Sequence, residues 1–113
     1  MNGNSVRVNL FIMDKKHSIV LFNQKEVRRH FDESKEVWYF AIIDVIGVLT
    51  DSSTPGRYWS DLKRKLVIEG SEVYEKIVKL KFMASDGKKY PTDCFSTEDL
   101  LRVIQTIPSP KAE

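Results

Sequence analysis

The sequence predicts a small α+β domain in which an antiparallel sheet packs against about three helices. Short apolar runs separated by polar turns occupy residues 18–40, a period near that of a helix begins at residue 41, and strict alternation appears at residues 77–82. Short runs between polar turns are typical of antiparallel strands, and the change of period separates helix from strand. The order of these segments also predicts a helix-turn-helix-like pair followed by a basic β-hairpin.

The chain has 113 residues, which is the size of one domain and is large enough to bury a core. We expect residues 1–17 to form an N-terminal extension that could be flexible, and residues 18–113 to form a single domain. The one cysteine, Cys94, excludes an intramolecular disulfide and a multi-cysteine zinc site. No apolar run has the length of a membrane span, and the first residues lack the pattern of a secretory signal. These features predict a cytoplasmic protein.

Three strands are expected in the first part of the domain. The apolar run Ser18–Phe22 predicts the first, and Val27–Asp32 and the aromatic-rich Val37–Phe40 predict the second and third. Polar turns at Asn23–Glu26 and Glu33–Glu36 separate them. The three strands therefore form a predicted antiparallel meander.

A short helix over about residues 41–49 follows from an apolar stripe at helical spacing, formed by Ala41, Ile42, Val45, Ile46 and Leu49. The polar segment 50–55 then breaks the chain and begins a longer helix, with Thr54 as the candidate N-cap and Pro55 at the first helical position. This second helix is expected to run to about Glu69, before Gly70. Its predicted core face consists of Tyr58, Trp59, Leu62 and Leu66. Its opposite face holds Arg57, Ser60, Asp61 and Arg64, with Lys63 and Lys65 on the flanks.

A basic hairpin is predicted over about residues 77–95. Lys79 and Lys81 alternate with apolar residues, and Asp86-Gly87 is a hairpin turn signal. Pro91 is expected to place the return strand at a sheet edge or to shorten it. A last helix is predicted to begin near Ser96 and to stop at Pro108. Its expected apolar stripe is Leu100, Leu101, Val103, Ile104 and Ile107.

Catalysis is poorly supported by the sequence. His17 and His30 lie in different segments without metal-ligand spacing, and Cys94 has no neighbour that marks a reactive thiolate. No phosphate-binding loop, dinucleotide-binding fingerprint or serine-hydrolase motif is visible. Asp44 and Asp61 are the kind of carboxylates that helix surfaces commonly carry. We therefore expect no enzymatic activity, no cofactor and no metal.

Nucleic-acid binding agrees better with the pattern. Residues 57–89 carry nine basic and five acidic side chains, a local charge of +4 in a chain of net charge +2. In helix-turn-helix modules one helix enters the major groove while lysines and arginines contact phosphates. The candidate DNA contacts are Arg57, Ser60, Lys63, Arg64 and Lys65 on the second helix and Lys79, Lys81, Lys88 and Lys89 on the hairpin.

Each of these features also has a purely structural interpretation. An amphipathic helix with basic residues outside is ordinary, and lysines on an exposed strand prevent edge-to-edge aggregation. The aromatic residues Trp38, Tyr39, Tyr58 and Trp59 are typical of core packing, whereas base stacking requires exposed rings.

Several ordered motifs over residues 27–113 resemble the Bro-N domain, the N-terminal domain of phage antirepressor-like proteins. They are Trp38–Val45, Arg57–Leu66, Glu69-Gly70, Ala84–Lys88, Thr92-Asp93 and Glu98–Arg102. The stretch Ile104–Glu113 is similar to the bacterial subgroup that includes DNA-damage-inducible protein D.

The resemblance implies a DNA-binding α+β domain of a prophage antirepressor-like or DNA-damage-response regulator. In the damage-inducible relatives it implies a link to the recombinase filament. The family's motifs fall on Trp38, Asp44, Arg57, Tyr58, Trp59, Lys63 and Lys65, with no catalytic role attached. Relatives continue beyond the position of Glu113, so the chain is expected to be a fragment of a longer protein with a separate C-terminal region.

A second hypothesis is a protein-interaction module that captures a repressor or a recombinase without binding DNA itself. Such a module is expected to expose an apolar patch of several hundred Å². A nucleolytic or hydrolytic enzyme, the third hypothesis, needs clustered carboxylates or a metal. The sequence leaves open whether the DNA is duplex or single-stranded, and a homodimer is compatible with it.

Overall fold

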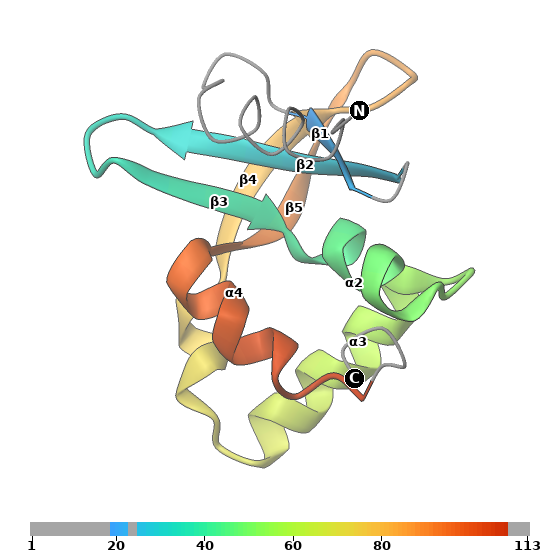
Figure 1. Ribbon diagram of the computed structural model, residues 1–113, viewed down its shortest axis with the longest axis vertical. Coiled ribbons are helices and arrows are strands. Elements are labelled where there is room, and N and C mark those ends of the chain that lie inside the picture. The colour runs from blue at the N-terminus through green and yellow to red at the C-terminus, as the bar shows by residue number, and fades with distance from the viewer. Residues whose placement is uncertain (1–18, 23–24, 109–113) are drawn as a thin grey trace, which may run out of the picture.

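The computed structural model describes residues 19–22 and 25–108, in which the chain forms an α+β fold (Figure 1). The strands are β1 (Ile19–Phe22), β2 (Lys25–Asp32), β3 (Val37–Ala41), β4 (Val78–Met83) and β5 (Lys89–Ser96). The α-helices are α2 (Ile42–Thr50), α3 (Pro55–Ile68) and α4 (Thr97–Ile104), and a 3₁₀ helix, η1 (Glu72–Lys76), precedes β4. The predicted fold class is confirmed.

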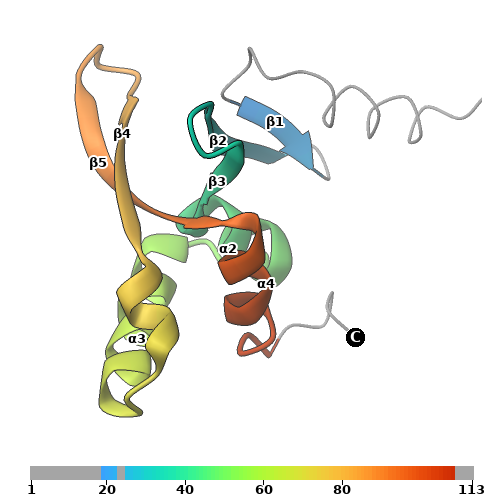
Figure 2. The ribbon, with the colours of Figure 1, turned by 90° about the vertical axis from the view of Figure 1, so that its left-hand side faces the viewer.

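The strands of the described residues form one antiparallel sheet in the order β1-β2-β3-β5-β4. The first three strands form the predicted meander. The hairpin β4-β5 then joins it through β5, which pairs with β3 from Tyr39↔Ser96 to Ala41↔Cys94. The helices gather beside one end of the sheet, and the hairpin projects away from them (Figures 1 and 2).

Alternation along the central strands separates the buried residues into two clusters. Phe40 and Phe95 face the helices in the larger cluster, which also holds Ile42, Ile46, Leu62, Leu66 and Val103. Tyr39, Ala41 and Cys94 face the opposite side in a smaller cluster, together with half-buried Val78, Leu80 and Phe82. The sheet is therefore apolar on both faces where β3, β4 and β5 meet.

The pair α2–α3 forms the predicted helix-turn-helix-like unit. Pro55 occupies the first turn of α3, and Trp59, Leu62 and Leu66 are buried as the helical period predicts. Thr54 stands at the N-cap, but its side chain forms no capping hydrogen bond.

Helix α2 is anchored to β2 by an ion pair. Asp44 accepts hydrogen bonds from the backbone N–H, Nε and Nη2 of Arg28 at 2.8, 2.8 and 3.0 Å. At the other end of the helix, Lys25 Nζ donates to the Gly47 carbonyl at 2.9 Å and to the Asp51 carboxylate at 2.7 Å. These contacts fix the helix-turn-helix-like pair against the sheet.

Pro91 lies in β5, which spans eight residues and is an interior strand. The return strand is therefore neither shortened nor an edge strand along its whole length, although it lies at an edge where Pro91 itself stands. Proline is tolerated there because β5 pairs with β3 only at residues 94–96. At Pro91, β4 is the one described strand that pairs with β5. No described strand on the other side needs a hydrogen bond from residue 91, so the missing N–H of proline costs no pairing there.

Four further expectations were wrong. The predicted turn Asn23–Glu26 extends too far, because Lys25 and Glu26 already pair with β1 in β2. Ala41 ends β3 in extended conformation instead of beginning the helix. Leu101 is 57% exposed, because the core face of α4 is set by Leu100 and Val103. Helix α4 also ends at Ile104, and turns carry the chain on to Ile107.

The predicted extension at residues 1–17 lies outside the described residues. Among the described helices, none combines the length and the apolar character that crossing a membrane requires.

Candidate nucleic-acid interface

The outer face of α3 carries the basic residues that the helical period predicts there. Arg57, Ser60, Arg64 and Lys65 are exposed, while Lys63 is half-buried on the flank. Arg64 Nη1 lies 3.2 Å from the carboxylate of Asp61, one turn away, and both side chains are mostly exposed. An exposed pair of this kind contributes little to stability and leaves the arginine accessible.

The hairpin presents its lysines on one face because side chains alternate along a strand. In β4, Lys79 and Lys81 are exposed while Val78, Leu80 and Phe82 are half-buried. Lys89 begins β5 opposite Met83, and Lys88 precedes it in the turn. Gly87 has a φ of +83°, and the backbone N–H of Lys88 donates to Asp86 at 2.8 Å, as a turn at Asp86-Gly87 requires.

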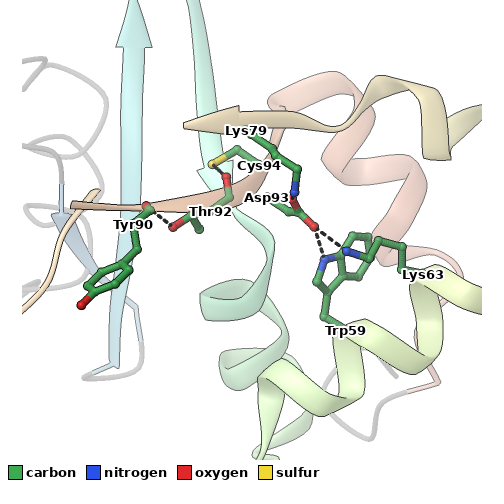
Figure 3. Close-up of polar contacts among 7 residues, drawn as sticks. All are labelled: Trp59, Lys63, Lys79, Tyr90, Thr92, Asp93 and Cys94. Carbon is green, nitrogen blue, oxygen red and sulfur yellow. Dashed lines mark hydrogen bonds and ion pairs between the residues drawn. The ribbon is translucent and has the colours of Figure 1, made fainter. Parts of the chain in front are cut away.

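The helix and the hairpin meet at Asp93 of β5, which is 7% exposed (Figure 3). Its Oδ2 accepts hydrogen bonds from Trp59 Nε1 at 2.8 Å and from Lys63 Nζ at 3.0 Å. Its Oδ1 accepts from Lys79 Nζ at 2.7 Å. One carboxylate thus joins two residues of α3 to one residue of β4.

Burial alone raises the pKa of Asp93, since the charged form loses water. The hydrogen bonds from Lys79, Trp59 and Lys63 outweigh that effect and lower the pKa from 3.8 to about 2. The same contact raises the pKa of Lys79, chiefly through its hydrogen bond to Asp93. The junction is therefore a fixed anion between two cations at neutral pH.

Asp93 was not predicted as a site residue. In a hairpin, facing residues are equally distant from the turn, so a two-residue turn at Asp86-Gly87 predicts Lys79 opposite Cys94. The observed register centres on Asp86 and places Lys79 opposite Asp93. The contact of Asp93 with α3 could not be predicted from the sequence, because the contact depends on where the helix packs against the sheet.

Two of the nine predicted contact residues share the buried carboxylate of Asp93. Lys63 and Lys79 both bind Asp93, with side chains 34% and 67% exposed. Five others are exposed and form no ion pair with any described residue: Arg57, Lys65, Lys81, Lys88 and Lys89. Arg64 and exposed Ser60 complete the set. The structure brings one residue of each group, Lys63 and Lys79, together at Asp93, whereas Lys88 and Lys89 lie at the hairpin turn, which projects away from the helices (Figures 1 and 2).

The described residues contain no group of three or more His, Cys, Asp or Glu side chains that could hold a metal ion. Cys94 is fully buried, and burial raises the pKa of its thiol to about 12. His30 is exposed on β2, and His17 lies outside the described residues.

Both tryptophans pack in or against the larger core cluster. Trp59 is 2% exposed and packs edge-on against Phe95, with ring centroids 5.8 Å apart. Trp38 is half-buried, and the guanidinium of Arg29 lies 4.0 Å from the centroid of its ring. The core role expected for these two tryptophans agrees with their burial.

Comparison with known proteins adds nothing to this geometry: no family model, no curated protein and no solved structure matches the chain.

Proposed function

We propose that this domain binds DNA through a basic face formed by the outer side of α3 and the lysine-bearing side of the hairpin β4-β5. The observation that carries the proposal is the Asp93 junction, which bonds to Lys63 of α3 and Lys79 of β4 and so makes the two basic surfaces adjoin. A helix-turn-helix-like pair followed by a basic hairpin suits a duplex, because the helix fits the major groove while lysines neutralise the phosphates beside it.

In this arrangement α3 presents Arg57, Ser60 and Arg64 toward base edges or the backbone. Lys65 lies on a flank of the helix, where a groove wall approaches. The hairpin lysines Lys81, Lys88 and Lys89 supply electrostatic affinity without reading sequence. Phosphate contacts of this kind make the affinity fall linearly with the logarithm of salt, with a slope of about −0.9 per phosphate neutralised on duplex DNA.

The test is fluorescence anisotropy with labelled random duplex and single-stranded DNA, over about 50 to 300 mM salt. We expect binding with a steep salt dependence, and the double variant Arg57→Ala/Arg64→Ala should bind at least about tenfold more weakly, which corresponds to about 1.4 kcal/mol. The matched control is Lys35→Ala/Arg102→Ala, which removes two exposed positive charges from the β2–β3 turn and from α4. Absence of binding at tens of micromolar in low salt would overturn the proposal. Unchanged binding by the arginine variant would overturn the role of α3.

We further propose that the domain belongs to a cytoplasmic regulator of the prophage antirepressor-like or DNA-damage-response kind. This assignment is supported only by the resemblance of its motifs to the Bro-N domain. It needs no cofactor or catalytic group.

A second candidate function, capture of a repressor or recombinase protein, is favoured by exposed apolar residues at the end of α3 and in η1. Val67, Ile68 and Tyr74 are 49%, 77% and 41% exposed. In size-exclusion chromatography with a purified recombinase, co-elution that is lost in Ile68→Ser would support capture. If DNA binding were also unaffected by that variant, the two functions would reside on separate surfaces.

A further inference from the structure

We propose that Asp93 is a charge clamp that competes with DNA phosphates for Lys63 and Lys79, so that the phosphate contacts of the hairpin fall mainly to Lys81, Lys88 and Lys89. The inference rests on the proposed DNA-binding function and specifies which lysines of the basic face contribute to affinity.

The geometry of the carboxylate supports a clamp. Asp93 is 7% exposed and receives three donors, one of which is the indole N–H of buried Trp59 at 2.8 Å. The indole holds the carboxylate in place, because Trp59 itself is packed in the core. An approaching phosphate must therefore compete with a fixed anion that already lies 3.0 Å from Lys63 Nζ and 2.7 Å from Lys79 Nζ.

The same hairpin face supplies an internal comparison. Lys81 lies two residues beyond Lys79 in β4, and Lys89 lies four residues before Asp93 in β5, so alternation places all of them on one side. Lys81 and Lys89 are exposed and form no ion pair within the described part of the chain. On the hairpin, Lys79 thus differs from Lys81 and Lys89 mainly in that an anion already binds it, whereas Lys63 is in addition half-buried on α3.

With a clamp, the domain neutralises fewer DNA phosphates than the number of basic residues on the proposed face suggests. Each phosphate contact adds sequence-independent affinity, whereas base contacts discriminate between sequences. By binding two lysines, Asp93 lowers the part of the binding affinity that does not depend on DNA sequence. A larger part of the affinity then comes from Arg57 and Arg64 on α3. Asp93 is in this sense a specificity-determining residue that need not touch DNA.

The first test compares two double variants by salt titration on random duplex DNA. Lys63→Gln/Lys79→Gln removes the clamped charges but keeps an N–H donor for Asp93, and Lys81→Gln/Lys89→Gln removes two unclamped charges. We expect the first variant to lose the smaller part of the slope, at most about 0.9, because Asp93 already offsets one of its two charges. The salt slope of the second variant should be shallower by up to about 1.8, since each lost phosphate contact removes about 0.9 from the slope. Equal losses in the two variants would overturn the clamp.

The second test is Asp93→Asn, in which the amide oxygen still accepts from Trp59 while the negative charge is lost. The salt slope should become steeper by up to about 0.9, because the loss of one negative charge frees one lysine charge for a phosphate. Asp44→Asn is the control, because Asp44 is also an ion-paired, partly buried carboxylate but binds Arg28 of β2. A folded Asp93→Asn variant, verified by circular dichroism, with an unchanged or shallower slope would overturn the inference. If the variant fails to fold, the comparison of the glutamine variants decides.

These outcomes are distinct from failure of the proposed function. If neither the wild type nor any variant binds duplex DNA, DNA binding itself is overturned and the clamp with it. If the wild type binds and the two lysine pairs behave alike, only the clamp is overturned.

Discussion

A buried carboxylate that stays ionised ties its own protonation to the stability of the fold. Asp93 has a pKa of about 2 in the folded protein against an ordinary value of 3.8. Because the folded pKa is the lower one, its stabilising contribution is complete above about pH 4 and is lost as the pH falls toward 2. At neutral pH the full contribution is present.

This predicts a specific difference between wild type and Asp93→Asn. In urea denaturation at a series of pH values, the free energy of unfolding of the wild type should decrease between about pH 4 and pH 2, and the variant should lose part of that decrease. Asp32 and Asp86 also have lowered pKa values, chiefly through hydrogen bonds from Ser34 and Tyr90, so some dependence on pH should remain in both. Identical pH profiles for the two proteins would contradict the role given to Asp93.

Cys94 provides a second prediction at the scale of one residue. Its thiol is fully buried and its raised pKa of about 12 leaves almost no thiolate at neutral pH. We expect a disulfide reagent such as dithionitrobenzoate to react with the native domain only very slowly and with the urea-unfolded chain at once. Since the chain has one cysteine, the absorbance change reports this site alone. Rapid modification of the native protein would mean that the smaller apolar cluster opens readily.

At the scale of the element, two glycines in the basic region should respond to alanine in opposite directions. Gly87 has a φ of +83°, where a Cβ costs roughly 1–2 kcal/mol, so Gly87→Ala should destabilise the domain by about that amount. Gly56 lies in the first turn of α3 with nothing within 4 Å of an added Cβ. Gly56→Ala should therefore stabilise by up to about 1 kcal/mol. Chemical denaturation of the two variants measures both signs, and a stabilising Gly87→Ala would contradict the turn geometry.

Most elements were predictable because each carries a local signal. Alternation predicted the half-buried face of β4, and Pro55 marked the start of α3. The 3₁₀ helix η1 was not predicted, because a segment of five residues is too short to show a helical period in the sequence. Leu101 was misplaced because a helix of eight residues buries only a narrow stripe, and the width of that stripe depends on its neighbours.

At the scale of the whole molecule, the two basic elements of the candidate interface could be predicted, but the contact between them could not. The basic character of α3 and of the hairpin follows from the sequence, whereas their contact at Asp93 depends on tertiary packing. Arg29 illustrates the same limit. Alternation with Val27 places it toward the core, yet arginines are seldom fully buried, and its 1% exposure depends on the ring of Trp38.

Strand β5 pairs with β3 only from Cys94 onward, which divides the hairpin into a supported base and a two-stranded arm. Backbone amides at the base exchange with solvent only when the sheet itself opens, whereas amides of the arm need only a local fluctuation. Hydrogen exchange of the free domain should therefore be slow at residues 94–96 and much faster at residues 81–83 and 88–90. Duplex DNA that contacts the arm should slow this exchange, which gives a readout of the arm that is independent of affinity.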